Sequence, residues 1–90
     1  MVKILCNLTS LDFNAHHITT LYKIIGKNVR KIRKQKGVSQ LDLALAVGYK
    51  SVSSIAKAES LIENKHFNIE QLYKISKALG VPIEKFFEGV

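Results

Sequence analysis

The chain has 90 residues, of which 47% are apolar, and its 14 Lys and Arg residues against 7 Asp and Glu give a net charge of +7. This length predicts one compact domain, because it is too short for two independent cores. The single cysteine, Cys6, excludes an intramolecular disulfide, and the sequence lacks the CxxC and HxxxH spacings of zinc sites. We therefore expect no metal and no other cofactor.

The first residues do not show the pattern of an export signal or a membrane anchor. The apolar run of residues 1–13 is broken by Asn7, Thr9 and Ser10, so it differs from the continuous apolar region of a signal peptide. No run approaches the roughly 18 to 20 apolar residues that span a bilayer. We expect a soluble, cytoplasmic protein without a membrane partner.

The excess positive charge is concentrated in one segment. Positions 23–36 hold seven basic residues and no acidic one, and the other seven Lys balance the seven acids elsewhere. A concentrated positive segment favours a polyanionic partner such as nucleic acid. The alternative is an ordinary solvated basic helix face.

Residues 1–19 are predicted to form an arm, and residues 20–90 the domain. Val2, Ile4, Cys6 and Leu8 alternate with other residues, a weak period of two. This pattern predicts either a short strand that pairs with a second copy or a loose arm. The adjacent His16 and His17 would point to different faces of any helix, so they are interpreted as surface residues and not as metal ligands.

A basic amphipathic helix is predicted from about Thr20, capped by Thr19 or Thr20, to Gly37. Its apolar positions recur at the helical period. These positions are Leu21, Ile24, Ile25, Val29 and Ile32. The basic residues lie mostly off this stripe, so the helix is expected to have an apolar inner face and a cationic outer face.

A short capped helix is predicted to follow. Ser39, with Asp42 three residues later, forms a capping pattern. Gly48 suits the left-handed backbone that ends a helix and turns the chain. The predicted inner face of this helix is Leu41, Ala44, Leu45 and Val47.

The next helix is predicted to start at Ser51 as its cap and to direct Ile55 and Ala58 inward. Its outer face is small and polar, made of Ser53, Ser54, Ala56 and Lys57. Such a face suits a helix that enters a DNA major groove, although serines are equally compatible with ordinary helix caps.

Two further helices complete the prediction. Asn68 is expected to cap a helix that ends at Gly80, with Gln71 as the reciprocal capping partner. Pro82 fits the start of a final short helix over residues 83–87. Because Phe86 and Phe87 are adjacent, we expect one of them to lie at a partner surface, with the core or its lid as the alternative for either.

Residues 23–88 resemble the Cro and phage-repressor class of helix-turn-helix DNA-binding domains. The segments that carry this resemblance are VRKIRKQKGVSQLDLALAVG, YKSVSSIAKAE and LYKISKALGVPIEKFF. It implies an all-α, five-helix repressor-like fold in which the second and third helices form the DNA-reading unit.

The resemblance also implies roles for individual residues. Arg33 and Glu59 match the family's structural ion pair, and Gln40 matches a glutamine placed beside the DNA backbone and the first recognition residues. The positions on or beside the recognition face are Lys50, Ser51, Ser53, Ser54 and Lys57. The candidates for phosphate contacts are Arg30, Lys34, Lys36, Lys50 and Lys65.

The sequence departs from the family pattern in the third helix and the turn before it. The turn YKSVSS is one residue longer than the commonest form, which shifts the register of the recognition positions. Ser60 replaces the Gly that commonly ends the third helix, so this helix is expected to run on through Leu61 and Ile62.

The expected function is that of a sequence-specific double-stranded DNA-binding transcriptional regulator, a homodimer on a palindromic operator. The alternative is a protein-interaction module or antitoxin-like partner that binds through Phe86, Phe87 and the N-terminal arm. An enzyme is not expected, because the sequence offers no Ser-His-Asp or Cys-His set and no phosphate-binding Gly loop.

Overall fold

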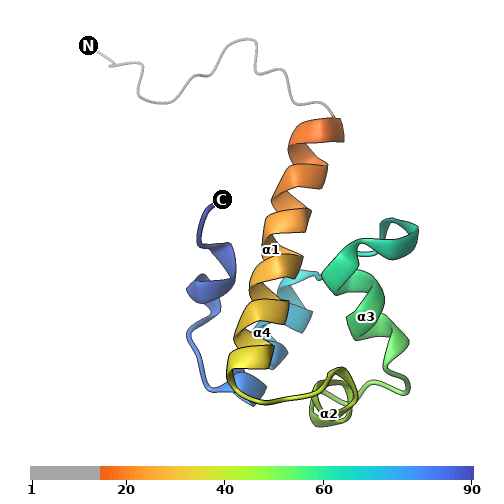
Figure 1. Ribbon diagram of the computed structural model, residues 1–90, viewed down its shortest axis with the longest axis vertical. Helices are drawn as coiled ribbons and strands as arrows, with labels where there is room; N and C mark the ends of the chain where they lie inside the picture. The colour runs from red at the N-terminus through yellow and green to blue at the C-terminus, as the bar shows by residue number, and fades with distance from the viewer. Residues whose placement is uncertain (1–14) are drawn as a thin grey trace.

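The computed structural model describes residues 15–90, so residues 1–14 of the arm or strand predicted over residues 1–19 lie outside the described part. The described part is all-helical and contains no strand. Its elements, in chain order, are α1 (Ala15–Gln35), α2 (Gln40–Ala46), α3 (Ser53–Ser60), the 3-10 turn η1 (Ile62–Asn64), α4 (Ile69–Leu79) and the 3-10 turn η2 (Ile83–Phe87) (Figure 1). The predicted fifth helix is thus the 3-10 turn η2, and residues 15–90 form four α-helices.

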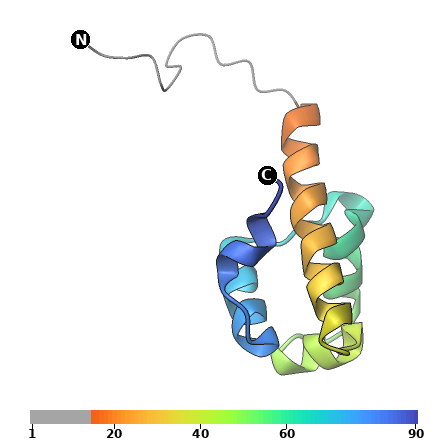
Figure 2. The same cartoon turned by 60° about the vertical axis from the view of Figure 1, so that its left-hand side comes forward.

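The long helix α1 runs through the molecule, and the other elements pack around its C-terminal part. In both ribbon views α3 lies on one side of α1 and η2 on another, while α2 lies beyond its C-terminal end (Figures 1 and 2). The first turns of α1 extend past the other helices, so residues 15–20 are exposed. No helix in the described part of the chain is long and apolar enough to cross a membrane.

The helix α1 begins earlier than predicted. It starts at Ala15, and the Thr20 hydroxyl donates a hydrogen bond to the His16 carbonyl oxygen at 2.9 Å. Thr20 is therefore inside the helix and bonds back to the preceding turn, which Ser and Thr side chains commonly do. The predicted cap at Thr19 or Thr20 is wrong.

Every α-helix and the turn η2 contribute to one hydrophobic core. The buried apolar residues are Ile25, Val29, Leu43, Ala44, Ile55, Ala58, Phe67, Leu72, Ile75, Leu79 and Phe86. Full burial of each large side chain stabilises the fold by about 1.5 to 3 kcal/mol. Phe86 is in this core, whereas Phe87 packs against it and is half-buried.

The predicted caps of α2 and α4 are confirmed. The Ser39 hydroxyl accepts a hydrogen bond from the Asp42 N–H at 2.9 Å. Asn68 and Gln71 form a complete capping box, with both hydrogen bonds at 2.8 Å. These bonds satisfy helix N–H groups that have no partner within their own helix, so the starts of both helices are fixed by local sequence.

The predicted inner face of α2 is wrong in two positions. Leu43 and Ala44 are buried, but Leu41 and Leu45 are 53% and 65% exposed. Residues four apart share a helix face, so Leu41 and Leu45 together form the outer side of this seven-residue helix. Such a short helix presents only a narrow face to the core, and Leu43 and Ala44 fill it.

The ends of α3 also differ from prediction. The N-cap of the helix is Val52 and not the predicted Ser51. Ser51 lies one residue before Val52, and its hydroxyl oxygen accepts a hydrogen bond from the Ser53 N–H at 3.3 Å. At the other end the helix stops at Ser60, because Leu61 adopts the left-handed conformation with φ 55°. The predicted continuation through Leu61 and Ile62 is wrong.

Close packing of α1 against α3 depends on Gly26. A Cβ atom at this position would lie 2.8 Å from the carbonyl oxygens of both Ala58 and Glu59. Real Cβ atoms do not approach backbone that closely, so the two helices cross at this distance only because residue 26 has no side chain. This crossing places the C-terminal half of α3 firmly on α1.

Candidate nucleic-acid interface

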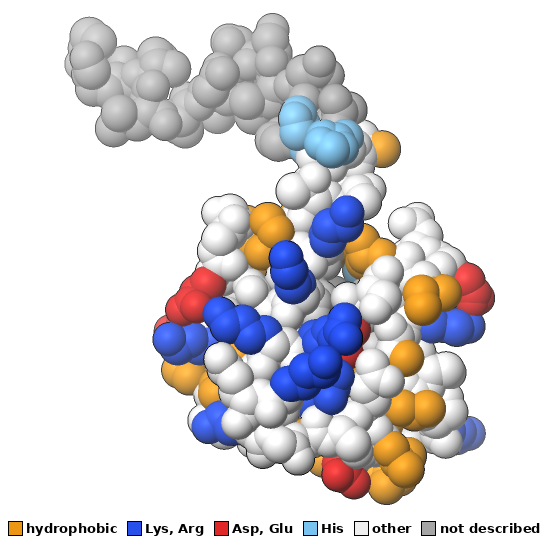
Figure 3. All heavy atoms as spheres, viewed as in Figure 1, with side chains coloured by type: hydrophobic (Ala, Val, Ile, Leu, Met, Phe, Trp, Pro, Cys, Tyr) orange, Lys and Arg blue, Asp and Glu red, His pale blue; other side chains and the backbone are white. Residues whose placement is uncertain are grey.

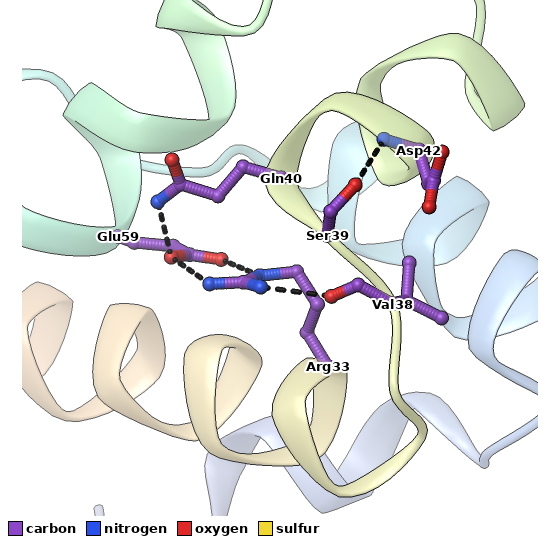
Figure 4. Close-up of polar contacts among 6 residues, drawn as sticks. All are labelled: Arg33, Val38, Ser39, Gln40, Asp42 and Glu59. Atoms are coloured by element: carbon purple, nitrogen blue, oxygen red, sulfur yellow. Dashed lines mark hydrogen bonds and ion pairs between the residues drawn. The ribbon is translucent and has the colours of Figure 1, made fainter.

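A buried ion pair joins α1 to α3. The Arg33 Nε atom lies 2.7 Å from Glu59 Oε2, and Nη2 lies 3.0 Å from Oε1 (Figure 4). Arg33 also donates from Nη1 to the Val38 carbonyl oxygen at 2.8 Å. Both residues are buried, with exposed fractions of 5% and 6%. Since its guanidinium is occupied and enclosed, Arg33 orients α3 and is not available to a phosphate.

Gln40 links α2 to the same carboxylate. Its Nε2 atom donates to Glu59 Oε1 at 3.0 Å, and Figure 4 shows its amide oxygen pointing away from Glu59. Glu59 therefore gathers side chains from α1 and α2 onto α3. This network fixes the angle between α2 and α3 and leaves the Gln40 oxygen available to an external donor.

The outer face of α3 borders a shallow hollow of about 250 Å³. Its lining residues come from α3, from the following loop and from the start of α4: Ser53, Ser54, Lys57, Ala58, Lys65, His66 and Gln71. Four of the predicted contact residues, Ser53, Ser54, Lys57 and Lys65, are thus brought together across 12 positions of sequence. Hydroxyl and ammonium groups at one concave surface can donate to base edges or phosphate oxygens.

The turn before α3 carries two further predicted residues. Lys50 and Ser51 are exposed between α2 and α3. The hydroxyl oxygens of Ser51 and Ser53 are 2.8 Å apart and share a hydrogen bond. This bond connects the turn to the first exposed hydroxyl of α3.

The basic residues of α1 form a separate positive surface. Lys and Arg side chains gather over α1 in the middle of the face drawn in Figure 3. Arg30, with Lys23 and Lys27, lines a hollow of about 220 Å³ beside Ser60 and Leu61 at the end of α3. This part of α1 therefore extends the positive charge up to the edge of α3.

The structure does not place Lys36 with these groups. Lys36 lines a different hollow, between α1 and η2, together with Val81 and Lys85. Lys34 is exposed in the last turn of α1. The predicted phosphate contacts thus divide among the α3 side, with Lys50 and Lys65, the exposed side of α1, with Arg30 and Lys34, and the η2 side, with Lys36.

The family model described as helix-turn-helix matches residues 29–86. The match covers more than half of the chain and includes α2, α3, α4 and nearly all of η2. The chain belongs to the Cro/C1-type helix-turn-helix family. No curated protein matches it in the comparison of sequences.

Membership in the helix-turn-helix family identifies the chain as a DNA-binding transcription regulator. Within the helix-turn-helix unit, α2 is the first helix and α3 the recognition helix, which enters the major groove in this class of motif. In this chain, α3 carries small exposed side chains on its outer side and is held from below by the buried network of Arg33, Glu59 and Gln40.

Sequence reasoning missed one contact of the recognition helix. The Lys57 Nζ atom donates to Glu63 Oε2 at 2.5 Å and to Oε1 at 3.0 Å. The hydrogen bond from Lys57 and its positive charge lower the pKa of the Glu63 carboxyl below its ordinary value. The pair was not predictable, because α3 was expected to continue where the chain turns back.

The described residues contain no group of three or more His, Cys, Asp and Glu side chains that could hold a metal ion. His16 and His17 are exposed near the start of α1, with ring centroids 6.3 Å apart. His66 stacks on Tyr22, with centroids 3.6 Å apart, and so joins the α3–α4 loop to α1.

Proposed function

We propose that this chain is a sequence-specific regulator of transcription that binds double-stranded DNA as a homodimer on a palindromic operator. The observation that carries the proposal is the network of Arg33, Glu59 and Gln40, which fixes α3 against α1 and α2. With its inner side held, α3 presents on its outer face the hydroxyls of Ser53 and Ser54 and the ammonium of Lys57, which is paired with Glu63 at the surface. Preorganised donors of this kind suit direct readout of base edges.

Base readout is assigned to the α3 face and its neighbour Gln40. Lys57 can donate to the O6 and N7 atoms of guanine, and Ser53 and Ser54 can exchange hydrogen bonds with several bases. The Gln40 amide is positioned beside the recognition helix through Glu59. Ser51 supports the first of these positions through its bond to Ser53.

Phosphate contacts are assigned to cations around this face. The residues in this role are Arg30, Lys34, Lys36, Lys50 and Lys65. They orient the protein without reading sequence. Arg30 and Lys65 flank α3 from the α1 side and the loop side, respectively, whereas Lys36 lies on the side of η2.

A two-fold dimer follows from the size of the reading unit. One recognition helix covers a half-site, so tight binding requires two subunits with half-sites about one helical turn, or about 34 to 36 Å, apart. We place this dimer in the cytoplasm and assign it no catalytic activity, since regulation here requires only binding.

A second candidate function is that of a protein-interaction module. It is favoured by an apolar hollow of about 330 Å³ that Phe87 lines together with Leu21, Tyr22 and Phe67. Phe86, the other aromatic residue considered for such contacts, is fully buried and is part of the core. A stable complex with another protein and no preferred DNA sequence would favour this candidate.

The test of the proposed function is the double variant Ser53→Ala and Lys57→Ala. Each good contact to a base edge contributes about 1 to 3 kcal/mol of discrimination. We therefore expect this variant to lose most of its preference for the selected operator over random DNA, measured by titration of labelled duplexes. Its melting temperature should change little, because Ser53 is exposed and the Lys57–Glu63 ion pair that is lost lies at the surface, where such pairs contribute little.

The matched control is Lys74→Ala, which removes an exposed lysine from α4. It should lower binding to all duplexes slightly and leave the preference unchanged. A Ser53→Ala, Lys57→Ala protein that kept its full sequence preference would show that another face of the protein reads DNA.

A further inference from the structure

The ammonium of Lys57 is already occupied in the DNA-free structure. Lys57 projects from α3 and donates to both carboxylate oxygens of Glu63, at 2.5 and 3.0 Å. The two side chains are 36% and 53% exposed, so the pair is at the surface. A ligand can therefore reach Lys57 and displace the Glu63 carboxylate from it without unfolding the domain.

An unusual backbone brings Glu63 back to α3. Leu61, Glu63 and Asn64 adopt left-handed conformations with φ of 55°, 56° and 59°. Gly, Asn and Asp adopt this conformation readily, so Leu61 and Glu63 are the two unusual residues here, and such strained sites often cluster at functional regions. The segment 61–64 contains no glycine. Its backbone therefore directs a carboxylate onto the recognition helix at a conformational cost.

The negative charge of Glu63 lies at a surface that is proposed to bind the negatively charged DNA. Lys57 lines the same hollow as Ser53, Ser54 and Lys65, where the proposed function requires donors for DNA. Glu is ionised at neutral pH at its ordinary pKa, and the hydrogen bond from Lys57 lowers the pKa of Glu63 further. An anion bonded to a DNA-contacting lysine must compete with DNA for that lysine.

We propose that Glu63 is an intramolecular competitor for Lys57 that suppresses binding to DNA without the operator sequence. This inference rests on the proposed function. On random DNA, Lys57 stays paired with Glu63 instead of contacting a phosphate. On the operator, an acceptor on a base edge replaces the carboxylate. Glu63 thus reduces non-specific affinity without contacting DNA itself.

The direct test is Glu63→Gln, which removes the charge while keeping the size of the side chain and its backbone requirement. Random duplex DNA is the probe, because it offers phosphates without a matched base edge. We expect its affinity to rise about two- to fivefold above the control, a range set by the strength of exposed ion pairs. The slope of log affinity against log salt should steepen by about 0.9, since one more phosphate is contacted.

The matched control is Glu70→Gln, which also removes one negative charge and one exposed ion pair, with Lys74 at 3.6 Å on α4. It accounts for the general effect of net charge on DNA affinity. In a Lys57→Ala background, most of the difference between Glu63→Gln and Glu70→Gln should disappear, because the lysine that is hydrogen-bonded to Glu63 is gone and only the weaker charge interaction of Glu63 with Lys65 remains.

The outcomes separate this inference from the proposed function. If the wild-type protein prefers its selected operator but Glu63→Gln behaves like Glu70→Gln, the competitor role of Glu63 is wrong and the proposed function stands. Weaker random-DNA binding by Glu63→Gln would also overturn it, since Glu63 would then orient Lys57 towards DNA. A wild-type protein without any operator preference would overturn the proposed function itself.

Discussion

Glu59 accepts hydrogen bonds from side chains of two other helices although it is almost fully enclosed. The guanidinium of Arg33 compensates its charge, and the Gln40 amide satisfies one oxygen a second time. A buried carboxylate is tolerated only with such compensation. At the scale of single residues, the position of the recognition helix thus depends on one acidic side chain and its donors.

Arg33→Ala should destabilise the domain, because it leaves the buried Glu59 charge without its main partner. Breaking a buried ion pair in this way typically costs about 3 to 5 kcal/mol. We expect a corresponding loss in the free energy of unfolding, measured by urea denaturation.

Arg30→Ala is the matched control for Arg33→Ala, since it removes an exposed arginine from the preceding turn of the same helix. It should weaken DNA binding and leave the urea midpoint nearly unchanged. If Arg33→Ala weakened DNA binding with unchanged stability, Arg33 would instead be a phosphate contact.

The two charge pairs of α3 differ in how far sequence could predict them. Arg33 and Glu59 are separated by 26 positions, and no local pattern connects them, so the pairing came from the family resemblance. Lys57 and Glu63 are close in sequence, but their pairing depends on the left-handed backbone at Leu61 and Glu63. Because neither residue is a glycine, the sequence does not indicate this backbone. Their geometry follows from tertiary packing and was missed.

At the scale of elements, the crossing of α1 and α3 determines how the recognition helix is presented. Gly26 lets the backbone of α1 approach that of α3, and the Arg33–Glu59 pair lies two turns further along α1. These two contacts hold α3 at separate points along α1. The angle at which α1 and α3 cross is therefore fixed by Gly26, which has no side chain, and by the Arg33–Glu59 ion pair.

Gly26→Ala should destabilise the fold even though alanine is the better helix former. The new methyl group would lie 2.8 Å from two backbone carbonyl oxygens, which no rotamer change can relieve. Overpacking of this kind costs about 1 to 3 kcal/mol, which outweighs the helix-propensity gain of at most about 1 kcal/mol. Thermal unfolding followed by circular dichroism measures the change.

The control for Gly26→Ala is Lys27→Ala, at the next and exposed position of α1. It gains helix propensity without a clash and should leave the melting temperature unchanged or slightly higher. A Gly26→Ala protein at least as stable as the wild type would show that α1 and α3 do not cross as closely as described.

Elements with their own caps were predicted well, and those shaped by neighbours were not. The helix ends at Ser39, Asn68 and Gly80 are formed by local hydrogen bonds or a left-handed backbone. Both features can be predicted from a short stretch of sequence. The buried face of α2 was wrong because seven residues give too few repeats to define a period. The role of Gly26 was missed because it depends on the close approach of α3, which the sequence around Gly26 does not show.

At the scale of the whole molecule, the excess positive charge lies along α1, and part of it borders the end of α3. The excess of +7 arises from positions 23–36, and these residues lie mostly on the exposed side of α1. The composition therefore predicted the class of partner. The placement of Lys36 beside η2, away from Lys57 and Lys65, required the structure, because sequence spacing does not show which side of the domain a loop-end residue faces.

The central claim is that a dimer of this chain reads a palindromic operator through α3. The most direct measurement is in vitro selection of bound duplexes from a random pool, followed by titration of the selected DNA at about 50 and 200 mM salt. We predict a palindromic consensus with half-sites about one helical turn apart and an affinity that falls by at least about 10³-fold between the two salt concentrations. Selection without any consensus, or an affinity independent of salt, would contradict this account.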